Sequence, residues 1–281
     1  IGGRNARKAV PEMLSLIERA REDGLDVMCD VYPYTAGSTQ LIHVLPPEFQ
    51  AGGTETLTKR LRDCAAREEM RARMETGSDF ENITLLVGFD NVVAIGLRTD
   101  EYRRFEGKSI AEIALALGKD PYDALFDLLA AEKCEAGMID YISDEEDLKA
   151  ILRAPFSGVI SDATYPGTGQ VHPRVYGAFA RLIETYVVRE KVLTLEQAVH
   201  KVTLQAAERF SLAGKGKIEA GMDADLLLFA PEKIQERGTY LAPKACASGF
   251  DEVFVLGERV IENGEYRGGS SGEMLGLRME Y

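Results

Sequence analysis

Two acidic residues each end an apolar, strand-like run, and these are positions where the sequence could place chemistry. Asp30 ends the run LDVMCD, and Asp162 ends the run SGVISD. In parallel α/β folds, functional residues lie at the carboxyl ends of strands and in the loops that follow them. Desolvating a carboxylate there is costly unless it serves as a ligand, base or hydrogen-bond acceptor, which makes Asp162 the sharper candidate. The pattern also allows a helix cap or a structural salt bridge at Asp162, and it favours a structural acceptor role for Asp30.

The elements that must position these acids alternate between helices and strands. Apolar residues at helical spacing predict a helix that begins near Val10 and ends at Gly24. It leads into a strand at 25–31, whose apolar residues on both faces are typical of a parallel strand covered on both sides. A charged helix is predicted over about 54–75 and a short strand over 83–88.

Helix-start signals dominate the stretch between the two acid-ending strands. Three helices are therefore expected there, starting at the capping box Ser109 to Glu112, the cap Asp120-Pro121 and the capping box Ser143 to Glu146. After the strand 157–162 and a Gly/Pro-rich loop, a helix is predicted over about 174–189, and Thr194 caps another that runs to Phe210.

The sequence pattern changes at Gly214, after which short apolar runs are joined by Gly-Glu and Asn-Gly turns. That pattern is typical of a small β-domain. Helix–strand alternation followed by β hairpins predicts an α/β fold: half of an α/β barrel with a β appendage. The expected boundaries are 1–212 for the barrel part, with an inserted helical excursion over about 42–150, and 213–281 for the β-domain.

The amino-acid composition argues against two classes of binding partner, nucleic acids and membranes. Of the 281 residues, 46 are acidic and 33 are Lys or Arg, and the formal charge of −13 argues against a nucleic-acid partner, whose phosphates it would repel. No apolar run reaches the roughly 20 residues of a membrane-spanning helix, so no membrane partner is expected. The four cysteines form no CxxC pair, which predicts reduced thiols and a cytoplasmic protein.

Several linked motifs resemble one known family, the N-acyl-D-amino-acid deacylases, or D-aminoacylases, of the amidohydrolase superfamily. The matching stretches, in family order, are DVYPYTAGSTQL, SDEEDLKAILRAPFSGVISDA, VHPRVYGAFARLIETYV, KVTLQAAERFSLAGKGKIEAGMDADLLLFAPEKI and VLGERVIENGE. They run from near residue 1 to the carboxyl terminus, so the resemblance covers nearly the whole chain.

The resemblance implies a metal-dependent (β/α)8 barrel with a small β-sandwich appendage, of which this chain would be the carboxyl-terminal portion. Zinc is held in the family by histidines from the barrel strands, and the acid after the eighth strand serves as metal ligand and proton shuttle. Asp162 occupies that position. The family's histidine ligands lie upstream of Ile1, so the chain is expected to bind no zinc alone and to be inactive alone.

The run YPYTAGST gains a role from the same resemblance. An enzyme that hydrolyses N-acyl amino acids must neutralise a free α-carboxylate, and hydroxyl donors at a strand end suit that task. The family's residues map onto Tyr32 and Ser38. The alternative is that Tyr32 and Tyr34 pack as amphipathic side chains and that Ser38 and Thr39 cap a turn, and packing is the favoured role for Tyr34.

The histidines carry less information. His200 lies off the apolar face of its helix, His43 has no partner at ligand spacing, and His172 either borders the pocket or orders its loop. Ala163 replaces the family's usual Gly, and the loop that follows, up to Gln170, is unusual. Both differences predict an atypical substrate preference.

The reaction expected of the intact enzyme is hydrolysis of N-acyl-D-amino acids to a carboxylate and a free D-amino acid. Two alternatives stay open: another amidohydrolase reaction such as cyclic amide hydrolysis, and a noncatalytic scaffold or binding fragment. Because the last barrel strands alone leave exposed edges, the fragment is also expected to self-associate.

Overall fold

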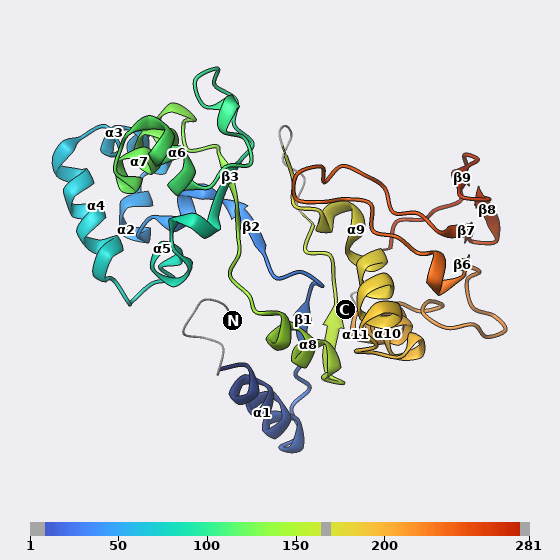
Figure 1. Ribbon diagram of the computed structural model, residues 1–281. Coiled ribbons are helices and arrows are strands. Elements are labelled where there is room, and N and C mark those ends of the chain that lie inside the picture. Colours follow the sequence, from blue (N-terminus) through green and yellow to red (C-terminus); the bar gives the residue numbers. More distant parts are fainter. Residues whose placement is uncertain (1–8, 164–169, 276–281) are drawn as a thin grey trace.

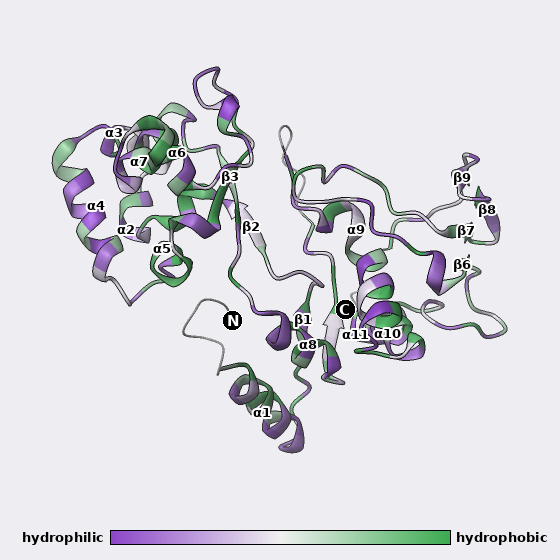
Figure 2. Cartoon of the chain, in the orientation of Figure 1, coloured by the Kyte–Doolittle hydropathy of each residue, from purple (hydrophilic) through white to green (hydrophobic). Residues whose placement is uncertain are grey.

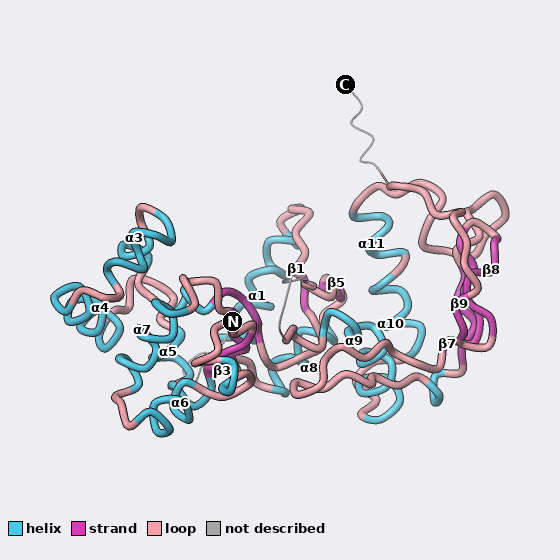
Figure 3. The backbone as a smooth tube through the Cα atoms, turned by 90° about the horizontal axis from the view of Figure 1, so that it is seen from above, coloured by secondary structure: helices cyan, strands magenta, loops and turns pink. Residues whose placement is uncertain are grey.

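The computed structural model describes residues 9–163 and 170–275. A group of helices lies at one end and a small antiparallel sheet at the other, with the strands β1 (Cys29–Val31) and β5 (Ser157–Val159) between them (Figures 1 and 3). No helix among the described residues is long and apolar enough to cross a membrane.

β1 and β5 form a parallel pair in the register Cys29 to Ser157 and Val31 to Val159. The pair is parallel as the sequence predicts, but β1 is shorter than the expected 25–31. The backbone N–H of Val27 donates to Leu25 O at 3.1 Å, so the chain leaving the preceding helix turns before it extends. Among the described residues, no further strand joins this sheet.

Helices pack around the strand pair. α1 (Ala9–Glu22) lies against α8 (Glu145–Arg153), and α8 contacts both strands. The cap of α8 is Asp144 rather than the predicted Ser143: the Asp144 carboxylate accepts from the N–H of Glu146 at 2.9 Å. A carboxylate there also favours the positive end of the helix dipole.

The chain leaves β1 through β2 (Gly37–Gln40) and returns through β4 (Gly137–Asp140), which pairs with β2 and with β3 (Val92–Ile95) in an antiparallel sheet of order β2-β4-β3. We call residues 37–140 the helical unit. Its helical segments are η1 (Leu41–Val44), α2 (Pro47–Gln50), α3 (Gly53–Arg60), α4 (Cys64–Thr76), α5 (Ile83–Val87), η2 (Phe89–Asn91), η3 (Arg103–Phe105), α6 (Ile110–Leu117) and α7 (Pro121–Ala131).

Two predictions within the helical unit are wrong. The helix expected over 54–75 is two helices, because Asp63 caps a new one at α4 by accepting from the N–H of Ala66. Consistent with its charged sequence, α4 is largely hydrophilic (Figure 2). The strand expected at 83–88 is the helix α5, which the buried Asn82 caps. A five-residue apolar run carries too little periodicity to separate strand from helix.

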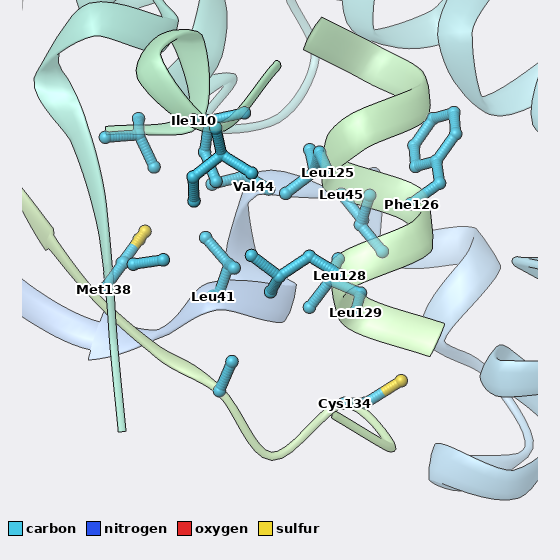
Figure 4. Packing of buried hydrophobic residues seen from close by; sticks show 14 of the residues in the cluster. Leu41, Val44, Leu45, Ile110, Leu125, Phe126, Leu128, Leu129, Cys134 and Met138 are labelled. Atoms are coloured by element: carbon cyan, nitrogen blue, oxygen red, sulfur yellow. The ribbon is translucent and has the colours of Figure 1, made fainter. Parts of the chain in front are cut away.

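The helical unit encloses its own apolar core. Leu125, Leu128 and Leu129 of α7 point toward Leu41 and Val44 of η1 (Figure 4), and these five residues are essentially inaccessible to solvent. The predicted caps fix the surrounding helices: Ser109 and Glu112 form a capping box at α6, and Asp120 caps α7.

The carboxyl-terminal helices follow the predicted pattern with two irregularities. α9 (Arg174–Arg181) continues as the π-helical η4 (Leu182–Arg189), and the helix that Thr194 caps breaks at Thr203 into α10 (Leu195–Val202) and α11 (Leu204–Arg209). α10 packs on β5 and η4, which encloses a second core around the fully buried Tyr186.

After α11 the described residues form one antiparallel sheet. Its strands are β6 (Leu226–Phe229), β7 (Phe250–Val255), β8 (Glu258–Glu262) and β9 (Glu265–Tyr266), and the one-turn η5 (Pro231–Lys233) follows β6. The Asn263-Gly264 turn joins β8 to β9 with positive φ at both residues, which is the conformation that a two-residue hairpin of this sequence prefers.

Candidate active site

A buried arginine that the sequence analysis had not singled out gathers the predicted site residues. Arg174, the first residue of α9, is 3% exposed, and its Nη2 lies 2.9 Å from Asp162 Oδ2. The same nitrogen donates to the backbone carbonyl of Ser38 at 3.2 Å, and the guanidinium carbon lies 4.5 Å from the ring centre of Tyr32. One guanidinium therefore joins the ends of β1, β2 and β5.

Asp162 follows β5 by three residues and adopts a left-handed backbone conformation, with φ of +46°. Aspartate tolerates this region better than most residues, because its short side chain can hydrogen-bond locally. The side chain is 50% exposed, so one part of the carboxylate pairs with Arg174 while another part faces solvent. The salt bridge that the sequence allowed is thus present, on a carboxylate that stays accessible.

Tyr32 and Ser38 reach Arg174 in different ways. Burial raises the pKa of the Tyr32 phenol, and the charge of the Arg174 guanidinium over its ring opposes that rise. The O–H of Tyr32 keeps its own proton to donate. The Ser38 hydroxyl instead donates to the Met138 carbonyl at 2.9 Å and would have to release that bond to donate to a ligand.

Tyr34 has the packing role that the sequence favoured. It is 3% exposed, and its hydroxyl donates to Glu236 Oε1 at 2.6 Å. Arg181 holds the other Glu236 oxygen at 3.0 Å and lies over the Tyr34 ring. These contacts tie the segment after β6 to the strand end that carries Tyr32.

His172 orders its loop. Its Nδ1 accepts from the N–H of Arg174 at 3.0 Å, which leaves Nε2 to donate to the carbonyl of Ala36 at 3.0 Å. Burial and the nearby Arg174 charge together lower the pKa of His172 to about 3, so the ring is neutral. Both nitrogens are engaged, and neither is open to a metal. His43 and His200 are exposed, and neither belongs to this cluster.

Asp140 is a second residue that sequence reasoning missed. It ends β4 opposite Gly37, and its Oδ1 lies 2.7 Å from the place where a Cβ on Gly37 would stand. It is 5% exposed, and burial raises the pKa of its carboxyl to about 6. The signal was hidden because GMID, four residues of ambiguous pattern, was not predicted to be a strand.

The residues present do not make a metal site by themselves. In ranges 9–163 and 170–275, no group of three or more His, Cys, Asp and Glu side chains is arranged to hold a metal ion. Asp162 is one carboxylate, whereas zinc takes three or four protein ligands. The loop residues 164–169, which the sequence marked as unusual, lie outside the described residues.

The family model described as "Amidohydrolase family" matches residues 94–240. The chain belongs to the amidohydrolase family. It is 30% identical over 244 residues to an N-acyl-D-glutamate deacylase of Alcaligenes xylosoxydans xylosoxydans, a match that covers 87% of this chain and 40% of that enzyme.

Solved structures support an α/β amidohydrolase fold for this family member. A D-aminoacylase variant in complex with copper chloride matches with a TM-score of 0.73 and 28% identity, over 98% of this chain and 48% of that one. The Bordetella bronchiseptica N-acyl-D-glutamate deacylase, complexed with zinc and a phosphonate inhibitor, matches with a TM-score of 0.66 and 28% identity, over 91% and 43%. The chain thus spans less than half the length of each of these relatives.

Proposed function

We propose that the intact enzyme hydrolyses the amide bond of N-acyl-D-amino acids, and that this chain supplies its carboxylate-recognition site and one catalytic carboxylate. The names of the relatives support the reaction. The observation that carries the proposal is the buried Arg174 guanidinium, which faces Asp162 and the Tyr32 phenol.

Arg174 has capacity left for a ligand. Its Nε is buried and has no hydrogen-bond partner among the described residues. A buried N–H without a partner is costly, and a planar carboxylate is the acceptor that a guanidinium prefers. We assign this donor, together with the Tyr32 O–H, to the α-carboxylate of the substrate, and Ser38 as a third donor once it releases Met138. A cyclic amide without a free carboxylate would leave the Arg174 donor unpaired.

Asp162 is proposed as the proton carrier. When a water oxygen attacks the amide carbonyl carbon, the carboxylate takes the water proton and then returns it to the departing nitrogen as the C–N bond breaks. Its ion pair with Arg174 fixes one oxygen, and its solvent-facing part can reach water. Asp162 is also proposed as a zinc ligand of the intact enzyme; since one carboxylate does not fit a zinc site, the other ligands would lie outside the described residues.

The finer architecture is part of the same proposal. The parallel β1–β5 pair and the TM-scores support a (β/α)8 barrel, and the gap between α11 and β6 supports a domain boundary near residues 212 and 213. A cytoplasmic location and self-association of the isolated chain remain predictions. Light scattering tests the second: a monodisperse monomer at high concentration would contradict it.

The test compares substrates of the intact enzyme. N-acetyl-D-amino acids should be hydrolysed, whereas their L forms and their carboxamides should not. Arg174→Met should lower kcat/KM by roughly 100-fold or more, because it removes a charged hydrogen-bond donor. Tyr32→Phe should chiefly raise KM, and Tyr122→Phe in α7 serves as the matched control. Equal turnover of acids and carboxamides would contradict the assignment of Arg174.

A further inference from the structure

Asp140 carries a charge that neither the fold nor the proposed reaction uses. Within the described part of the chain, the structure shows no ion pair between its carboxylate and a Lys, Arg or His, although the residue is 5% exposed and the Arg174 charge acts on it. A buried carboxylate without a cationic partner destabilises a fold, so its presence beside a binding site points to a role there.

The position of Asp140 is fixed by contacts to the same backbone that Arg174 holds. Asp140 lies over Gly37, where any Cβ would collide with its Oδ1, and Arg174 donates to the carbonyl of the next residue, Ser38. Both charged groups therefore flank the Gly37-Ser38 segment. Both charges act on Tyr32: burial chiefly raises the pKa of its phenol, the Asp140 and Asp162 charges raise it further, and the Arg174 charge lowers it.

The charges around this segment do not balance once a substrate is bound. Arg174 already pairs with Asp162 and, under the proposed function, also receives the α-carboxylate. Asp140 adds a further negative charge without a cation of its own. An acidic substrate side chain would bring one more carboxylate into this cluster, where low effective dielectric strengthens repulsion between like charges.

Resting on the proposed function, we propose that Asp140 determines substrate class: the site takes N-acyl-D-amino acids with uncharged side chains and rejects those of D-glutamate and D-aspartate. The selection is by repulsion, and so it acts on binding. This selectivity would distinguish the chain from the relative named N-acyl-D-glutamate deacylase, with which the chain shares 30% identity.

The decisive experiment compares N-acetyl-D-glutamine with N-acetyl-D-glutamate, which are nearly isosteric and differ in charge. The intact enzyme should prefer the glutamine derivative by roughly 10- to 100-fold in kcat/KM, mostly through KM. Asp140→Asn should reduce that preference about tenfold or more by raising kcat/KM for the glutamate derivative. The exposed Asp90→Asn controls for net charge and should change nothing.

A second measurement follows the same preference as a function of pH. Charged groups acting on Asp140 are Glu81, which raises the pKa of its carboxyl, and Arg174, which lowers it. As pH falls from 8 to 5, Asp140 takes up a proton while a glutamate side chain, of ordinary pKa about 4.3, stays mostly ionised. The preference for glutamine should then shrink in the wild type and stay flat in Asp140→Asn.

Binding separates this inference from the proposed function. If no N-acyl-D-amino acid is turned over, the proposed reaction fails, and titration calorimetry with the same two compounds still decides the role of Asp140. Tighter binding of the glutamine derivative that Asp140→Asn abolishes supports it. Equal affinity or equal turnover of the two compounds by the wild type overturns it, as does a preference that Asp140→Asn leaves unchanged.

Discussion

The helical unit and the β1–β5 strand pair bury their apolar surface in different ways. In the helical unit, buried residues from Leu41 to Met138 form one continuous core. Of the large hydrophobic side chains that the described residues expose, only Leu85 and Leu115 belong to this unit, and the others lie outside it. Among the described residues the strand pair has no third strand, and its core is shared among α8, η4 and α10.

The difference follows from the range of the contacts. Amphipathic helices separated by short loops can cover each other's apolar faces within one stretch of about 100 residues. A parallel strand needs neighbours that lie far away in the sequence, because each crossover uses a helix. The helical unit thus covers its own apolar surface, whereas the strand pair shares its core with helices from distant parts of the chain.

The largest expected effect is a core truncation in the helical unit. Phe126→Ala removes a side chain that is 1% exposed and should cost about 3–5 kcal/mol of unfolding free energy. Leu228→Ala in β6, at 55% exposure, should stay within about 0.5 kcal/mol. Urea titration of both variants measures the contrast; similar midpoint shifts would contradict a self-contained core in the helical unit.

Replacing Asp140, which lies where the helical unit joins the candidate site, should raise the free energy of unfolding. The pKa of its carboxyl is raised to about 6 in the folded state from 3.8 in the unfolded chain, so the charged form costs folding free energy above pH 6. Asp140→Asn should therefore stabilise on the order of 3 kcal/mol at pH 8. That gain should shrink below pH 6 and vanish below about pH 4. Thermal melts of the wild type and of Asp140→Asn across this pH range test whether the substitution stabilises the fold.

Lys201 tests how the strand pair is held. Its buried Nζ donates to the carbonyls of Ala154 and Ser157 at 2.6 and 2.8 Å, at the edge of β5. Lys201→Met should cost about 1–3 kcal/mol, because it leaves buried carbonyls short of a donor. Lys119→Met, which removes an exposed ion pair with Asp127, should cost at most about 1 kcal/mol. Amide exchange at β5 should rise only in the first variant.

The smallest effects come from a matched pair of capping boxes. Ser109→Ala at α6 and Thr194→Ala at α10 each remove a hydroxyl that accepts from a backbone N–H, at a cost of about 1 kcal/mol. In the helical unit the loss should lower the midpoint of the whole unit, because its core is continuous. At α10 it should show mainly as faster local amide exchange, and a reversed pattern would contradict the difference between the regions.

The sequence by itself determined the features that depend on local chemistry. The caps Ser109, Asp120 and Thr194 stand where they were predicted, since a hydroxyl or carboxylate satisfies free N–H groups within its own first turn. The parallel character of the strand predicted at 25–31 was also readable, from apolar residues on both faces, and so was the family, because its motifs span nearly the whole chain. The roles of Asp162, Tyr32 and Ser38 remain proposals.

Tertiary structure alone decided what joins distant residues. Arg174 is one cation among 33 Lys and Arg in the sequence, and only the fold buries it against Asp162 and Tyr32. The three-stranded sheet and the helix α5 were missed because runs of four or five residues carry too little periodicity to fix their type. The role of Asp140 could be inferred only from the structure, in which β4 pairs with β2 and places Asp140 opposite Gly37. The pKa of its carboxyl is raised by burial among neighbours remote in sequence, which the residues next to it in the chain do not reveal.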